Sequence, residues 1–170
     1  MADKIKTIAE ALAEVKIDYS QLQHIPEKFK TAELCLEAVI DNGWALEFVP
    51  TKLKTIKLCR KAVKSTGNAL QYVPDEYRTA EICLLAVEND GNALKFVPEK
   101  IKTVELCVEA VLEVYSTEES VYKSFIRSKN EGTGVYIPKE SKQEEFFEYI
   151  PENIKLQVEA ELKKIDDCYR

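Results

Sequence analysis

The chain has 170 residues, of which 45% are hydrophobic and 32% charged, and its formal net charge is −6. This length suits one domain with a core of ordinary size, and the negative charge argues against a nucleic-acid binder or a protein held on anionic membranes. We find neither a signal-peptide pattern nor an apolar run long enough for a membrane span. The five cysteines, an odd number, favour a reducing, cytoplasmic setting.

The first element is an imperfect copy of a pattern that recurs further along the chain. Residues 4–15 read KIKTIAEALAEV and predict a short helix that follows Thr7. This stretch is in phase with the later copies but has Ala11 where they have cysteine. Because the terminal units of helical-repeat proteins are modified, we interpret 1–19 as an N-terminal capping copy.

Residues 20–115 contain four regular copies of one 24-residue pattern. A glycine and the string x-Ala-Leu-x-aromatic-Val-Pro follow the first three helical segments on the same spacing. Four in-phase copies with nine matched positions cannot arise by chance. The helical segments read TAELCLEAV, TIKLCRKAV, TAEICLLAV and TVELCVEAV, and they start at Thr31, Thr55, Thr79 and Thr103.

Each copy predicts one α-helix of about three turns and short helical pieces after it. Threonine favours the N-cap position, and the apolar residues from Ala32 to Val39 have the spacing of a helix with one buried face. Gly43 is expected to end the helix in a left-handed conformation. The segment 44–48 is too short for an independent helix, so its neighbours must hold it. Pro50 then starts another short turn.

The segment 116–170 departs from the spacing and is expected to hold a degenerate repeat. Ser116 and Glu119 form a capping-box motif ahead of an amphipathic stretch at 121–126. The polar stretch 133–145 predicts a loop, and it contains the first of two Tyr-Ile-Pro strings.

The second Tyr-Ile-Pro string ends at Pro151 and precedes a longer helix that is suited to closing a stack. Four apolar residues on one helical face predict this helix: Ile154, Val158, Leu162 and Ile165. The predicted fold class is therefore all-α. The whole chain, 1–170, is expected to form a single α-solenoid of 24-residue helical repeats with a modified C-terminal helical cap.

The strings KTxELCLxAV and ALxFVPExxKT, with their spacing, resemble a family of bacterial tandem repeats, the domain of unknown function 4116. The resemblance covers about residues 2–111 and implies no activity, cofactor or catalytic residue. The chain is also similar to the leucine-rich variant repeats, which stack an α-helix and a short 3₁₀ helix per 24 residues. It lacks the N-terminal cysteine cluster of that family, so no iron–sulfur cofactor is expected.

Four cysteines follow the repeat spacing and raise the question of a metal site or disulfides. Stacked helices lie about 8–10 Å apart, whereas a disulfide needs Cα atoms within about 7 Å and zinc holds sulfur at about 2.3 Å. We therefore interpret Cys35, Cys59, Cys83 and Cys107 as small buried hydrophobic residues, with no metal bound. Cys168 lies outside this ladder and has no evident partner.

The sequence offers no residue combination typical of a catalytic site. His24 is the only histidine and occupies the position held elsewhere by Phe48 or Phe96, so ring packing is favoured over a general-base role. The Gly-Thr-Gly at 132–134 lacks the strand and the lysine of a phosphate loop. We expect a non-enzymatic protein with no cofactor and no small-molecule substrate.

A basic residue precedes each helix cap and would form a column along one edge of a solenoid. One interpretation is a track for an anionic or acidic partner. The interpretation we favour is that each cation offsets the dipole of the preceding turn or pairs with an acid such as Glu27, Asp75 or Glu99. The column comprises Lys6, Lys30, Lys54, Arg78, Lys102 and Lys155.

Positions that vary between copies indicate where a partner could bind. The segment 51–66 has six basic residues and no acid, which makes it a candidate docking patch. Trp44 replaces an asparagine and either anchors a partner or packs over the capping copy. Leu85 replaces charged residues, and an exposed leucine there would mark a contact surface. The candidate partner-binding residues are Trp44, Lys57, Arg60, Lys61, Lys64 and Leu85.

The repeated positions serve the core and the variable ones individualise the surface, as an interaction scaffold requires. The leading hypothesis is a non-enzymatic module that binds a protein partner. The alternative is a small acidic regulator or inhibitor that occupies the nucleic-acid site of an enzyme. A lysine at 57 interrupts the column of glutamates at 33, 81 and 105, which argues against this alternative. An enzyme with His24 in a deep pocket ranks third.

Overall fold

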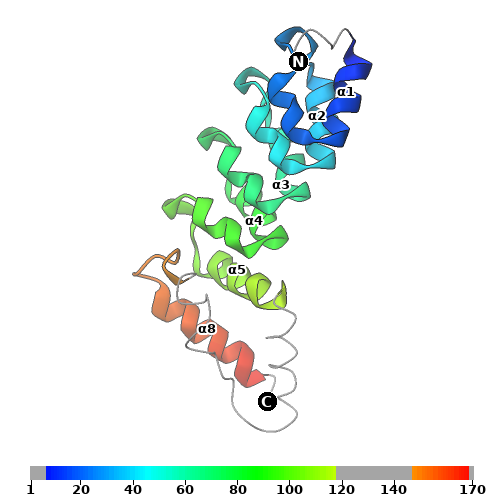
Figure 1. The fold of residues 1–170 in the computed structure, drawn as a ribbon. Coiled ribbons are helices and arrows are strands. Elements are labelled where there is room, and N and C mark those ends of the chain that lie inside the picture. The colour runs from blue at the N-terminus through cyan, green and yellow to red at the C-terminus, as the bar shows by residue number, and fades with distance from the viewer. Residues whose placement is uncertain (1–6, 118–146, 169–170) are drawn as a thin grey trace.

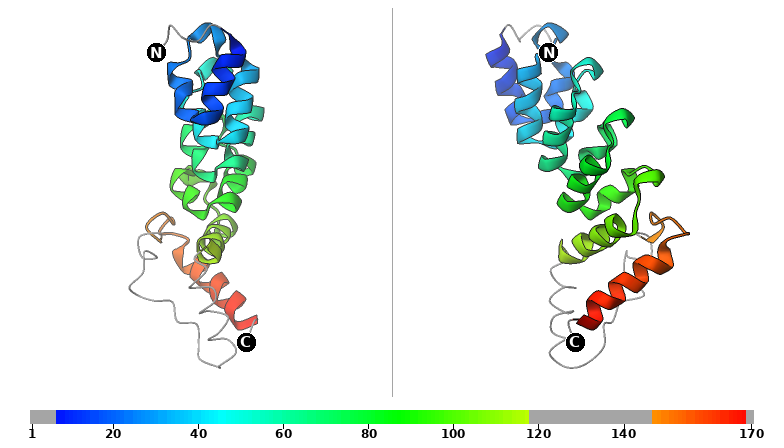
Figure 2. Two further views of the ribbon diagram at one scale, coloured as in Figure 1. Left: turned by 45° about the vertical axis from the view of Figure 1, so that its right-hand side comes forward. Right: turned by 180° about the vertical axis from the view of Figure 1, so that it is seen from behind.

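The computed structural model describes residues 7–117 and 147–168, and every regular element in these ranges is helical. The α-helices stack side by side along an elongated molecule, as Figures 1 and 2 show. The predicted α-solenoid is confirmed. Its α-helices are α1 (Ile8–Ile17), α2 (Ala32–Asp41), α3 (Ile56–Ser65), α4 (Ala80–Asn89), α5 (Val104–Thr117) and α8 (Lys155–Cys168).

Two 3₁₀ helices separate each α-helix from the next between α1 and α5. The longer ones contact one another in a second layer beside the layer of α-helices. The six-residue helices are η2 (Tyr19–His24), η4 (Gly43–Phe48), η6 (Gly67–Tyr72) and η8 (Gly91–Phe96). The three-residue helices are η3 (Glu27–Phe29), η5 (Thr51–Leu53), η7 (Asp75–Tyr77) and η9 (Glu99–Ile101).

The predicted threonine caps are present. The Thr31 hydroxyl accepts a hydrogen bond from the backbone N–H of Leu34 at 3.2 Å, which satisfies one of the free donors at the start of α2. Thr55, Thr79 and Thr103 cap α3, α4 and α5 in the same way. At the start of α1, Thr7 and Glu10 form a reciprocal capping box.

The glycine after each helix does not have the predicted role. Neither Gly43 nor its counterparts has a left-handed backbone, and α2 instead ends at an extended residue, Asn42, with φ −150°. An added Cβ on Gly43 would lie 2.3 Å from the carbonyl oxygen of Ala62 in the next α-helix. Glycine is therefore required because successive units approach each other closely, and the prediction of a left-handed cap was wrong.

The core is one continuous cluster that runs along the stack between the two layers. Two buried positions of the regular units become acidic in α1, where Glu10 and Glu14 replace the residues equivalent to Leu34 and Ala38. Because both glutamates are exposed, this side of α1 suits the solvent-facing end of a stack.

The C-terminal part differs from prediction at one described residue. Ser116 lies within α5, which continues to Thr117, so it is not the cap of a new helix. The predicted helix at 121–126, the loop at 133–145 and the first Tyr-Ile-Pro string lie outside the described residues. α8 packs against α5 with Val158 buried, and this confirms the predicted closing helix.

Candidate functional site

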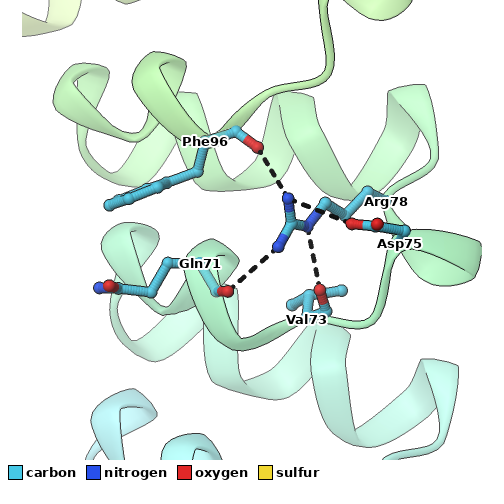
Figure 3. Close-up of polar contacts among 5 residues, drawn as sticks. All are labelled: Gln71, Val73, Asp75, Arg78 and Phe96. Atoms are coloured by element: carbon cyan, nitrogen blue, oxygen red, sulfur yellow. Dashed lines mark hydrogen bonds and ion pairs between the residues drawn. The ribbon is translucent and has the colours of Figure 1, made fainter.

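Arg78 shows what the column of basic residues does (Figure 3). Its guanidinium donates hydrogen bonds to the carbonyl oxygens of Val73 at 2.9 Å and Gln71 at 3.1 Å within its own unit. A third hydrogen bond, of 3.4 Å, reaches the carbonyl oxygen of Phe96 in the next unit. Asp75 lies 3.3 Å away and completes the charge balance. The side chain therefore joins two neighbouring repeats through backbone groups.

The same link recurs along the stack. Lys54 Nζ donates to the carbonyl oxygen of Tyr72 at 3.1 Å, and burial lowers the pKa of its ammonium group. Lys102 Nζ lies 2.6 Å from Glu99 Oε1, and its side chain is only 5% exposed. The favoured interpretation, pairing with nearby acids, is thus confirmed at Arg78 and Lys102. Lys30 and Lys155 are paired likewise, with Glu27 and Glu152.

The link at Lys102 also explains the second Tyr-Ile-Pro string. Lys102 Nζ donates to the carbonyl oxygen of Tyr149 at 2.8 Å, so Tyr149 takes the place that Phe96 takes in the preceding unit. The stack therefore resumes at 147 after the residues that break the spacing. Residue spacing alone could not reveal this equivalence, because the hydrogen bond depends on the position in space.

The four cysteines of the ladder are free thiols without solvent exposure. Burial raises the pKa of the Cys59 thiol to about 11, and it does the same for Cys35, Cys83 and Cys107. Such thiols stay protonated at neutral pH and are poor nucleophiles. Within the described ranges, no group of three or more His, Cys, Asp or Glu side chains could hold a metal ion. Cys168 is the last residue of α8.

Four basic residues of the predicted docking patch 51–66 lie on α3: Lys57, Arg60, Lys61 and Lys64. Lys52 lies on η5 instead, and Lys54 donates to the carbonyl oxygen of Tyr72. Arg60 Nη2 is 2.8 Å from Glu81 Oε2 on α4, so this guanidinium is already paired. Lys57, Lys61 and Lys64 are exposed, and no ion pair joins them to another residue in the part of the chain that the structure describes. The structure thus brings these four residues together and leaves three charges available.

Of the two apolar candidates, Leu85 lies on α4, the helix next to α3, at the position equivalent to Lys61, whereas Trp44 lies in the 3₁₀ layer. Trp44 is the second residue of η4. Its ring contacts the ring of Tyr72 in the following unit edge-to-face, with ring centroids 6.0 Å apart. It therefore packs toward the next unit, not over the capping copy, and in the 3₁₀ layer rather than beside the α3 lysines. Leu85 is half-buried against the core, whereas its neighbour Leu84 is 40% exposed, so the exposed leucine of α4 is Leu84.

His24 differs from the other residues at its position in the repeat. It ends η2 and is exposed, whereas Phe48, Tyr72 and Phe96 are half-buried. The expectation of a packed ring is wrong here because His24 belongs to the first described unit. In η2 it is Tyr19 whose ring lies near a ring of the next unit, with its centroid 6.5 Å from that of Phe48.

A family model described as Domain of unknown function (DUF4116) matches three overlapping stretches, 11–54, 32–78 and 56–102, which together span more than half of the chain. The chain belongs to the DUF4116 family. The match confirms the resemblance drawn from the repeated strings, and the DUF4116 model covers the chain from within α1 to the 3₁₀ helices that follow α4. Comparisons with curated proteins and with solved structures found no match. Among the described helices of this DUF4116 protein, none is long and apolar enough to cross a membrane.

Replacing Trp44 by alanine is expected to lower the free energy of unfolding by about 1–2 kcal/mol, because the edge-to-face contact with Tyr72 and part of the buried ring area are lost. Trp44→Phe keeps a ring and is expected to recover most of this loss. Urea unfolding followed by far-UV circular dichroism measures both variants, since the only tryptophan has been removed. An unchanged stability in Trp44→Ala would show that the ring is free for a partner.

Proposed function

We propose that this chain is a non-enzymatic helical-repeat scaffold that binds a protein partner through the outer side of its α-helix layer. The observation that carries the proposal is α3, whose exposed lysines form a basic strip on an acidic chain. The core does not require basic residues at these positions, because α2, α4 and α5 have glutamate or apolar residues there. The strip is therefore available for a role other than folding.

The basic strip has an energetic cost in the isolated chain. Lys57 and Lys61 are four residues apart, and so are Arg60 and Lys64. Like charges at this helical spacing destabilise a helix by about 0.2–0.5 kcal/mol per pair. Only Arg60 has its charge compensated, by Glu81. Carboxylates of a partner would remove the repulsion between the remaining lysines and provide specificity.

The buried free thiols support a reducing compartment, so we place the protein in the cytoplasm. The alternative of an acidic inhibitor that mimics nucleic acid is disfavoured, because α3 interrupts the acidic side chains of α2 and α4 at their centre. A continuous carboxylate surface would be required for such mimicry.

The proposal is tested by affinity capture from the source cells with quantitative mass spectrometry. The bait variant Lys57→Glu/Lys61→Glu reverses two charges on α3. The matched control Lys28→Glu/Lys100→Glu makes the same charge change at exposed residues of the short 3₁₀ helices η3 and η9, outside the segment 51–66. We expect a partner that wild type and control retain and the α3 variant loses at least about fivefold. Proteins bound equally by all three baits would contradict the assignment.

A further inference from the structure

The outer side of the α-helix layer, named the α-face here, is formed by the second, fifth, sixth and ninth residues of each of the helices α1 to α4. None of these residues is fully buried. The α-face comprises Ala9, Leu12, Ala13 and Lys16 on α1; Glu33, Leu36, Glu37 and Ile40 on α2; Lys57, Arg60, Lys61 and Lys64 on α3; and Glu81, Leu84, Leu85 and Glu88 on α4.

The charges on the α-face alternate from helix to helix. α2 has only acidic and apolar side chains there, α3 has only basic ones, and α4 has acidic and apolar ones again. α1 is apolar except for Lys16. Two apolar side chains are notably accessible for their kind, Ile40 at 46% and Leu84 at 40%. A surface with this composition combines apolar area with charges of both signs, as partner surfaces do.

Two-fold symmetry pairs this face with itself in a simple way. A two-fold axis that lies between α2 and α3, parallel to both helices, places α3 of one copy opposite α2 of the other and α4 opposite α1. Because the axis is parallel to the helices, residues at the same position in the repeat face each other. Two-fold dimers with self-complementary surfaces are the commonest protein oligomers.

The side chains brought together by this axis are complementary at every helix pair. Lys57 faces Glu33 of the partner subunit, and Lys61 faces the partner's Glu37. In the outer pairs, Glu88 faces the partner's Lys16, and Leu84 faces the partner's Leu12. Symmetry produces each of these contacts twice, so two of the three lysine charges that α3 leaves unpaired meet carboxylates, and Lys64 lies over the partner's Ile40.

Other positions of the axis oppose like charges. An axis through α3 sets its lysines against themselves, and an axis through α4 does the same for Glu81 and Glu88. An axis between α3 and α4 pairs the basic residues of α3 with Glu81 and Glu88 of α4, but it also places Glu33 opposite Glu105 and Glu37 opposite Glu109 in the outer helices. Like charges in direct opposition across an interface are unfavourable. Charge complementarity therefore selects the axis between α2 and α3.

We propose that the α-face is a self-association surface, on which a second copy of this chain docks with α2 over α3 about a two-fold axis parallel to these helices. The inference rests on the proposed function and names the partner that the α3 strip binds. It leaves the 3₁₀ layer, with Trp44 and Tyr72, facing away from the contact.

Sedimentation equilibrium of the full chain at low ionic strength tests the inference. We expect wild type to form dimers whose dissociation constant rises with salt. Lys57→Glu and Glu33→Lys are each expected to weaken dimerisation at least about tenfold, because each reverses two symmetry-related contacts. Lys100→Glu, with the same charge change on η9, is expected to dimerise as wild type does.

Mixing the two variants provides the sharpest arm of the test. A Lys57→Glu chain and a Glu33→Lys chain each oppose like charges in their own dimers, but in the mixed dimer both contacts are complementary again. An equimolar mixture is therefore expected to form heterodimers with wild-type affinity. Circular dichroism confirms that each variant is folded, and no contact within one chain can explain recovery on mixing.

Two results would overturn the inference. Wild type that stays monomeric up to millimolar concentration excludes self-association, and dimers that the Lys57 and Glu33 variants leave intact use another surface. Neither result contradicts the proposed function, because the α3 variant can still lose a partner of different sequence in the capture experiment. A bait that captures only its own chain would instead support both.

Discussion

Gly67→Ala is expected to lower the free energy of unfolding by about 3 kcal/mol, a large effect for one added methyl group. The new Cβ would lie 2.4 Å from the carbonyl oxygen of Ala86 and 2.9 Å from the backbone nitrogen of Asp90. Both atoms belong to the end of the α4 unit and cannot move aside without shifting the helix. In a chain of this size, the loss corresponds to a melting temperature lower by about 6–12 °C.

A second substitution separates close approach from backbone conformation. Asparagine tolerates a left-handed backbone, so Gly67→Asn would be the milder change if the glycine were needed for that conformation. Because Gly67 has no such φ value, we expect Gly67→Asn to be more destabilising than Gly67→Ala. Thermal unfolding of both variants decides the matter, with Gln23→Ala at an exposed site of η2 as a control that changes stability by no more than about 0.5 kcal/mol.

The repeat made most of the fold predictable from the sequence. Thr31, Cys35 and Pro50 and their counterparts recur every 24 residues, and each has one strong local preference or burial tendency. Four copies of the same preferences leave little freedom except a stack of identical units. Local preferences and their period are therefore sufficient to place the caps, the buried faces and the closing helix α8.

Features that depend on contacts between units could not be predicted in this way. The role of Gly67 follows from its distance to α4. In a sequence alone, a glycine can indicate either a left-handed backbone or a close approach, and the pattern does not distinguish the two. Tyr149 shares the string of a ring, a β-branched residue and proline with Phe96, but only its hydrogen bond with Lys102 places it next in the stack, since the intervening residues break the spacing. In both cases the deciding quantity is a distance across the stack.

In the candidate site, too, local features could be predicted from the sequence and contacts between helices could not. The sequence identified the basic residues of α3, because composition alone reveals a strip without acids. It could not show that Arg60 is paired with Glu81, or that Leu84 is more exposed than Leu85, since both depend on how neighbouring helices are rotated. The opposite charges of α2 and α3 on the α-face likewise become evident only when the two helices are placed side by side.

The strength of the link between units is tested by Arg78→Ala, which is expected to lower the free energy of unfolding by about 3 kcal/mol. The substitution leaves the carbonyl oxygens of Gln71, Val73 and Phe96 without their shared donor. Losing hydrogen bonds to a charged group at partly buried acceptors costs about 1.5–3 kcal/mol for a single bond, and the acceptors regain some of this from water. Urea unfolding with unchanged m-values provides the measurement.

The ion pair with Asp75 is not the source of this stability. Asp75 is 89% exposed, and an exposed pair contributes no more than about 1 kcal/mol, which salt screens further. Asp75→Asn is therefore expected to be nearly neutral, and Arg78→Lys to recover only part of the loss, since one ammonium cannot span carbonyls of two units as the guanidinium fork does. A loss in Arg78→Ala that disappears at high salt would instead assign the effect to the ion pair, and the basic column would then be a surface feature.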